Sequence, residues 1–269
     1  MSIPTALHDR RYDPVDPTAS FRAAAQQLLD AFAHEPFHAE MAHAPTVSDA
    51  EVAALGSPVG QLPADLVARF VLRAGSSWGT PDDLRRVAPR ALVLAADHAL
   101  PLDRAVLWER LRAAGWPAWP PGEVDAVTAF LRAEWARLVR SEPRPAHAVH
   151  RWLPAVSSAT PDLGPYLDDW HEALGPLTPP PHQHAAVGHL VALLLDSPLR
   201  PDLPETVAEL VAPGEHDAAA QLTAWLTGPA VGHQLQRATD ELSDTRASRR
   251  TSLALERLRR FTAATERTA

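Results

Sequence analysis

The chain of 269 residues contains no cysteine. This excludes disulfide frameworks, thiolate metal sites and cysteine nucleophiles. A chain without disulfides fits a reducing compartment, so we expect a cytoplasmic protein. Lysine and asparagine are also missing, and all 25 basic residues are arginine. Because alanine and proline are abundant as well, the composition indicates the codon bias of a GC-rich genome rather than selection for arginine chemistry.

Long hydrophobic runs are missing too. The longest one, from Val187 to Leu195, is interrupted by Gly188 and His189, and it is far shorter than the roughly 20 residues that a transmembrane helix needs. The N-terminal residues lack the apolar core of a secretory signal. We therefore expect no membrane association. The net charge of −8 makes general binding to nucleic acid unfavourable, since such proteins usually carry a basic face.

Residues typical of strands are scarce, and no stretch alternates apolar and polar side chains. Instead, apolar residues recur at every third or fourth position, which is the spacing of amphipathic helices. One such stripe consists of Leu84, Val87, Ala88, Ala91, Leu92 and Ala95. With 46% hydrophobic residues, the chain can bury a sizeable core. These observations predict an all-α fold.

Capping signals mark several helix starts. Ser48 and Glu51 have the spacing of a capping box, and Thr80 and Thr160 each precede a proline and an aspartate, as at a helix N-terminus. Pro89 lies inside a stripe and predicts a kink. The predicted helices cover 19–34, 48–55, 62–74, 81–97, 103–114, 122–140, 146–157, 162–174, 182–196, 204–212, 215–227, 229–243 and 247–265.

Short connections between these segments predict an irregular array of antiparallel helical hairpins that spans residues 1–269. Two proline-rich joints, at 141–145 and 177–181, are either domain seams or rigid corners of one array, and we favour corners. Successive short helix pairs also resemble a HEAT-like solenoid. However, the chain has no fixed internal period of the kind that regular repeats show.

The segment His34-Glu35-Pro36-Phe37-His38 matches the H-E-x-x-H pattern of zinc peptidases. In those enzymes an unbroken helix places both imidazoles on one face, and the glutamate acts as general base. Here Pro36 lies between the two histidines and disfavours a continuous helix. We therefore favour a helix terminus over a metal site, and keep a metal-dependent hydrolase using His34, Glu35 and His38 as an alternative.

Two aromatic junctions are candidate binding surfaces, because tryptophan and arginine are enriched where proteins bind partners. The first is the loop-to-helix corner that begins at Trp78-Gly79, and the second is the proline-stiffened turn around residues 116–119. Alternatively, the tryptophan rings at both junctions cover the edge of the hydrophobic core. The predicted binding residues are Trp78, Asp82, Asp83, Arg85, Arg86, Trp116 and Trp119.

The segment from Leu62 to Leu92, which contains the first junction, resembles a family of uncharacterised bacterial all-helical proteins of HEAT-like form. The resemblance is carried by Leu62-Pro63, Trp78-Gly79, Asp82-Asp83 and Pro89-Arg90-Ala91-Leu92, and it covers about 35 residues. It implies a helical fold in a bacterial protein and no known activity.

Other clusters carry weaker signals. Arginines 246, 249, 250, 257, 259 and 260 make the C-terminal helix locally basic, so nucleic-acid binding there is a further alternative. Apolar Leu255, Leu258 and Phe261 indicate that this helix also packs on the body. The closely spaced pairs His147/His150 and His182/His184 are interpreted as solvated or core-edge histidines rather than metal ligands.

The sequence contains no glycine-rich phosphate loop and no G-x-S-x-G motif. We therefore predict no catalytic residue, no cofactor and no resident metal. The leading hypothesis is a protein-interaction or scaffold module for a protein partner of unknown identity. The sequence leaves the oligomeric state open.

Overall fold

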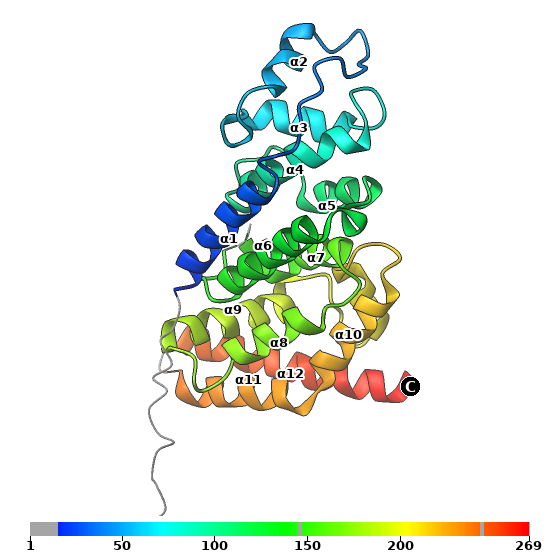
Figure 1. Ribbon diagram of the computed structural model, residues 1–269. Helices are drawn as coiled ribbons and strands as arrows, with labels where there is room; N and C mark the ends of the chain where they lie inside the picture. Colours follow the sequence, from blue (N-terminus) through cyan, green and yellow to red (C-terminus); the bar gives the residue numbers. More distant parts are fainter. Residues whose placement is uncertain (1–15, 145–146, 243–244, 269) are drawn as a thin grey trace, which may run out of the picture.

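The structure is a computed structural model that describes residues 16–144, 147–242 and 245–268. In this part of the chain the regular elements are all helices, and the only β-type pairings are isolated bridges. The helices stack into an elongated body, with α2 and α3 at one end and α11 and α12 at the other (Figure 1). The predicted all-α fold is confirmed.

The element bounds follow the predicted segments closely. The α-helices are α1 (Pro17–Ala31), α2 (Asp49–Leu55), α3 (Ala64–Arg73), α4 (Pro81–Ala96), α5 (Arg104–Ala113), α6 (Pro121–Val139), α7 (Leu153–Ala159), α8 (Gly164–Ala173), α9 (Pro180–Asp196), α10 (His216–Thr227), α11 (Pro229–Glu241) and α12 (Thr245–Thr268). Short 3₁₀ helices are η1 (Val59–Gln61), η2 (Trp116–Ala118), η4 (Val149–Arg151) and η5 (Pro204–Leu210).

The predicted capping box of Ser48 and Glu51 is present, and a second capping box lies at the start of α4. At the start of α2 the Ser48 hydroxyl accepts a hydrogen bond from the Glu51 N–H at 3.3 Å, and the Glu51 carboxylate accepts one from the Ser48 N–H at 2.8 Å. That backbone hydrogen bond is the main reason why the pKa of Glu51 is lowered. Thr80 and Asp83 repeat the arrangement at the start of α4.

Three local predictions are wrong. Thr160 does not cap a helix, because α8 begins at Gly164, whose N–H donates to the Asp162 carboxylate at 2.9 Å. Residue 146 of the predicted helix 146–157 lies outside the described residues, and the rest of that segment contains η4 and α7, since Pro154 suits only the first turn of a helix. In place of the predicted helix 204–212 the chain forms the 3₁₀ helix η5, which ends at Leu210, and the Thr206 hydroxyl bonds to nearby backbone there.

The core joins helices that are distant in sequence. The main partner of α1 is α6, where the rings of Phe21 and Phe130 lie 5.5 Å apart and the Arg137 guanidinium covers Phe21 at 4.3 Å. Chain neighbours also pair, as in α3 with α4 and α11 with α12, while α9 packs on α12. Buried side chains from Phe21 to Phe261 form one connected cluster. A regular solenoid would pair successive helices only.

The first proline-rich joint is fastened to α9. The His189 side chain donates from Nε2 to the Ser141 carbonyl at 2.9 Å, and His182 donates from Nδ1 to the Arg140 carbonyl at 3.0 Å. Residue 145 of this joint lies outside the described residues. At the second joint, Pro179 and Pro180 form the cap and first position of α9, where a missing N–H has no cost.

Helix α4 runs from Pro81 to Ala96 without interruption at Pro89, which is buried. Across the described residues, no helix combines the length and apolar character required to traverse a bilayer. The buried side chains Leu255, Leu258 and Phe261 attach α12 to the body, as the sequence predicts.

The buried imidazole of His189 predicts a loss of stability in acid. Burial lowers the pKa of His189 to about 4 from its usual 6.5. As the pH falls below 6.5, the unfolded chain therefore takes up a proton that the folded chain does not. We expect this one site to reduce the free energy of unfolding by about 3 kcal/mol at pH 4.

Urea unfolding at neutral pH and at pH 4 measures this drop in the free energy of unfolding. The drop should be smaller in His189→Gln than in the wild type, whereas His184→Gln, at an exposed position of the same helix, should leave it unchanged. Equal drops in all three proteins would contradict the assignment to His189.

Candidate functional site

The Trp78 corner is built mainly from inward-facing side chains. The indole of Trp78 is 1% exposed and meets the Phe70 ring edge-on at 5.3 Å. The carboxylate of Asp83 accepts hydrogen bonds from the Thr80 N–H at 2.7 Å and from the His38 ring at 2.7 Å. Only Asp82 of the acidic pair is exposed. The tryptophan therefore fills the corner of the helices instead of presenting a surface.

The two arginines of this corner also bind within the protein. Arg86 donates to the Ser57 carbonyl at 3.0 Å and to the Leu55 carbonyl at the end of α2. Arg85 forms a two-pronged ion pair with Glu123 of α6, at 2.6 and 2.5 Å, and lies 2.9 Å from the Glu35 carboxylate. The hydrogen bond to Glu123 is the main reason why the pKa of Arg85 is raised.

The second predicted surface, the 116–119 turn, lies over the end of α5. Trp116 is 6% exposed and packs on Trp108, with ring centroids 5.8 Å apart. Trp119 is half-buried, donates from Nε1 to the Ala114 carbonyl at 3.3 Å, and meets Phe32 edge-on. Beside Trp116 lies a cavity of about 310 Å³, also lined by Arg132.

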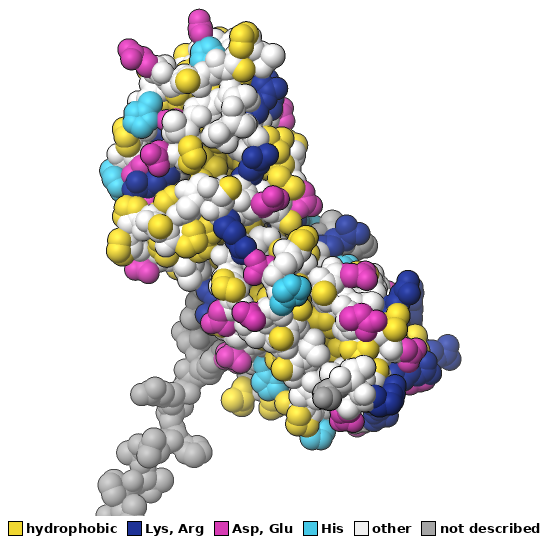
Figure 2. All heavy atoms as spheres, turned by 90° about the vertical axis from the view of Figure 1, so that its right-hand side faces the viewer, with side chains coloured by type: hydrophobic (Ala, Val, Ile, Leu, Met, Phe, Trp, Pro, Cys, Tyr) yellow, Lys and Arg dark blue, Asp and Glu magenta, His cyan; other side chains and the backbone are white. Residues whose placement is uncertain are grey.

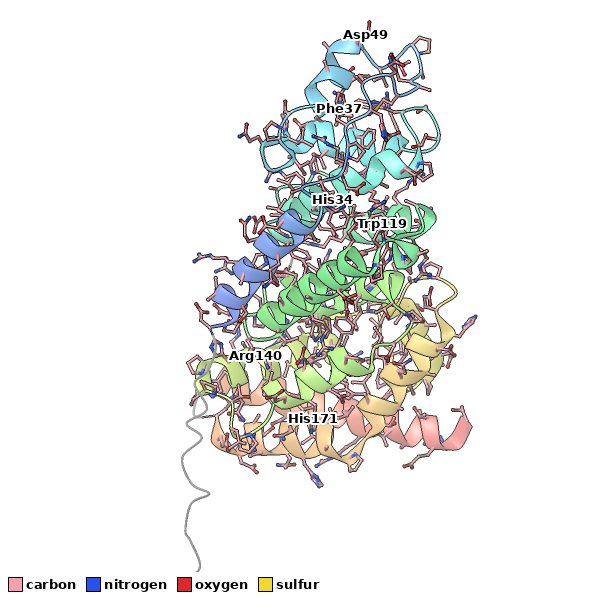
Figure 3. The ribbon with its side chains drawn as sticks, in the orientation of Figure 1. His34, Phe37, Asp49, Trp119, Arg140 and His171 are labelled. Carbon is pink, nitrogen blue, oxygen red and sulfur yellow. The ribbon has the colours of Figure 1, made fainter. Side chains whose placement is uncertain are left out.

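The H-E-x-x-H segment is not helical, because α1 ends at Ala31. Figure 3 labels His34 just beyond that end. Its imidazole lies 3.3 Å from the Glu35 carboxylate and 3.6 Å from Glu123, whereas His38 pairs with Asp83. The two histidines thus have different partners, and the arrangement lacks the shared helical face of zinc peptidases.

Ligand atoms of His34, Glu35 and Glu123 lie within 4.8 Å of one another and are the one such group among the described residues. These three could hold a divalent cation. However, Arg85 already neutralises both carboxylates, so a cation would have to displace the guanidinium and would be repelled by it. The geometry therefore favours an ion-pair cluster that joins α4 and α6 to the chain after α1.

The C-terminal arginines bind mostly to the protein itself. Arg257 donates to the carbonyls of Leu195 and Leu199, at 3.2 and 2.9 Å. Arg250 pairs with Asp196 at 2.7 Å, and Arg260 pairs with Glu256 on the same helix. On the face shown in Figure 2, acidic and basic side chains are interspersed. These contacts leave fewer free cations for a phosphate backbone than the sequence indicates.

A cavity lies between α9, α11, α12 and the chain around η4. Its volume is about 680 Å³, which is in the range of small-molecule binding sites. Apolar side chains form much of its wall: Pro143, Ala148, Val187, Val191, Ala192, Ala238, Leu242 and Ala247. Polar side chains stand among them: Arg144, His150, Arg151, Gln183, His184, Asp196, Glu241, Arg250 and Thr251.

One face of α9 forms the longest wall of this cavity. Residues 184, 187, 188, 191 and 192 recur at the spacing of a single helical face. Gly188 lets the joint approach closely, since a Cβ at this position would lie 2.8 Å from Cγ of Pro143. Any larger residue there would push the 143–144 segment away from the helix.

None of the predicted binding residues lines this cavity. Sequence reasoning did single out His150 and His184, but as solvated or core-edge histidines, and the structure brings both to the cavity wall. These two histidines are 34 positions apart, so the sequence alone does not predict that they line the same cavity. The sequence signal that points to the cavity is the composition of α9. Its apolar residues cover more of the helix surface than the single stripe needed to pack against a core.

No protein-family model, curated protein or solved structure matches the chain. The resemblance to HEAT-like bacterial proteins is therefore supported only in its coarse part, the all-helical fold.

Replacing Arg85, the half-buried cation of the ion-pair cluster, should be costly. Arg85→Leu leaves the carboxylates of Glu35 and Glu123 without their main partner, and Glu123 is almost fully buried. We expect a loss of about 3–5 kcal/mol in the free energy of unfolding, because an uncompensated charge stays in the interior.

The matched control is Arg260→Leu, which removes an exposed ion pair with Glu256 on α12. That change should cost only about 0.5 kcal/mol. Urea unfolding followed by circular dichroism measures both variants. A cost for Arg85→Leu as small as that of the control would contradict the structural role of the cluster.

Proposed function

We propose that this protein is a binding module that holds a small ligand with an apolar body in the cavity between α9, α11 and α12. The observation that carries the proposal is the cavity of about 680 Å³ with apolar side chains on three helices. Burying apolar ligand surface there supplies about 25 cal/mol per Å² removed from water. A few polar side chains at such a site suffice to orient a ligand.

Hydrogen bonds to other elements anchor two helices of the cavity wall, which favours a site that exists before the ligand binds. Helix α9 is anchored through His182 and His189 to the end of α6 and the residues that follow it. Helix α12 is anchored through Arg257 to the C-terminal end of α9. A wall fixed in this way reduces the ordering cost of binding.

Filling the cavity should abolish binding of an apolar ligand. Ala238→Trp on α11 places an indole at the cavity wall, and Leu242→Trp does so just beyond the end of that helix. A neutral fluorescent dye such as Nile red should bind the wild type and bind either variant at least about tenfold more weakly.

The control is Ala230→Trp, which adds the same side chain at an exposed position of α11 outside the cavity wall. Dye affinity should be unchanged there, and thermal unfolding confirms that each variant folds. A wild type that does not bind the dye, or blocked variants that bind it like the control, would overturn the proposal.

A second candidate function is the protein-interaction module expected from the sequence, with a HEAT-like array as its frame. It is favoured by the cavity of about 310 Å³ beside the 116–119 turn. Trp116 and Tyr166 give its wall the aromatic character of grooves that dock extended peptides, and Pro117, Pro161 and Pro165 also line it.

Thr128→Trp fills this second cavity from an exposed position of α6, and Ala129→Trp is the matched control at the next, also exposed, position. A protein partner bound there should be lost from pull-downs with Thr128→Trp and kept with Ala129→Trp. Identical partner lists for the two folded variants would remove this turn as a docking site.

A further inference from the structure

The cations around the cavity point to the chemistry of one end of its ligand. Arg144 and Arg151 are both exposed and both line the cavity. Among the described residues neither guanidinium has an ion-pair partner, whereas the third arginine of the wall, Arg250, is paired with Asp196 at 2.7 Å. Two arginines are therefore available to a ligand.

The acidic side chains of the wall are already neutralised. Asp196 pairs with Arg250, and Glu241 lies 3.5 Å from Arg237, which stands outside the cavity. Neither carboxylate is left to attract a cationic ligand. The uncompensated charge at the cavity is consequently positive.

His150 adds a polar atom that lacks a partner. Its Nδ1 is buried and has no hydrogen bond, although the residue lines the cavity. Burial and the neighbouring Arg151 lower the pKa of His150, so the ring is neutral at neutral pH. A buried polar atom without a partner is uncommon in a folded protein, but this nitrogen is not accessible from the cavity, so the ligand-accessible charge there belongs to the arginines.

Apolar side chains form much of the remaining cavity wall. Val187, Val191 and Ala192 from α9 face a cavity that Ala238 of α11 and Ala247 of α12 also line. A ligand that contacts both the apolar side chains and the two free arginines must combine an apolar chain with a negatively charged group. A charge against the apolar side chains, or apolar surface against the guanidinium groups, would be costly.

We infer that the ligand is an amphipathic anion, an apolar chain that ends in a carboxylate or a phosphate, with its charged group held by Arg144 and Arg151. This inference rests on the proposed function of the same cavity. Guanidinium groups bind both anions through paired hydrogen bonds, so the charge and not the acid type is the recognised property.

The test compares ligands that share one chain and differ only in the end group: lauric acid, lauryl phosphate, lauryl alcohol and lauryl amine. They are titrated below their micelle concentrations at neutral pH, with displacement of Nile red as the readout. The wild type should bind both anions about tenfold more tightly than the alcohol, as expected for a charge-assisted hydrogen bond, and should bind the amine most weakly.

The double variant Arg144→Gln/Arg151→Gln should lose this preference while its affinity for the alcohol stays unchanged. The control Arg267→Gln removes an exposed arginine 17 positions beyond Arg250 on α12, about 25 Å along the helix, and should behave as wild type. The wild type can prefer the acid over the phosphate, or the reverse. If the double variant loses its preference for both anions over the alcohol, either result supports the inference and identifies the acidic group.

Equal binding of acid and alcohol by the wild type would overturn the inference and leave the proposed function intact. A preference that survives in the double variant would also overturn it, since the charge would then be recognised elsewhere. If none of the four ligands nor the dye binds, the proposed function itself fails, and the inference fails with it.

Discussion

The structure depends on one helix that is apolar on two sides. Leu190, Leu193 and Leu194 of α9 are fully buried in the core, while Val187 and Val191 face the large cavity. A helix with a single apolar stripe would pack on the core and turn a polar face outward. Because α9 does not, α11, α12 and the joint after α6 gather around its second face and enclose a cavity there.

Arginine side chains connect the stacked helices at their ends. The carbonyl groups at or near the C-terminal end of a helix have no partner within the helix and carry partial negative charge. Here those of α4, α8 and α9 accept hydrogen bonds from Arg104, Arg237 and Arg257 respectively. Each of these arginines belongs to a different helix from the one that it caps. A composition that indicates codon bias thus supplies side chains with a defined structural role.

The fold could be predicted from the sequence because its signals are local. The spacing of Leu84, Val87 and Ala91, and the hydroxyl of Thr80 before them, place α4 without any knowledge of its neighbours. The wrong boundary within 146–157 also has a local cause, namely Pro154. The pairing of α1 with α6 could not be predicted in this way, because it depends on contacts between side chains more than 100 positions apart, such as Phe21 and Phe130.

The candidate site could not be predicted from the sequence for the same reason. Residues prominent in the sequence, Trp78 and Arg85, serve packing and an internal ion pair, whereas the cavity is made of ordinary valines, alanines and arginines that only the fold assembles. Whether this assembly binds a ligand is decided most directly by backbone amide NMR spectra recorded while lauric acid is added. Shifts concentrated at Val187, Val191, Ala192 and Arg151 are predicted. Shifts centred on the 116–119 turn, or none at saturating ligand, would contradict the central claim.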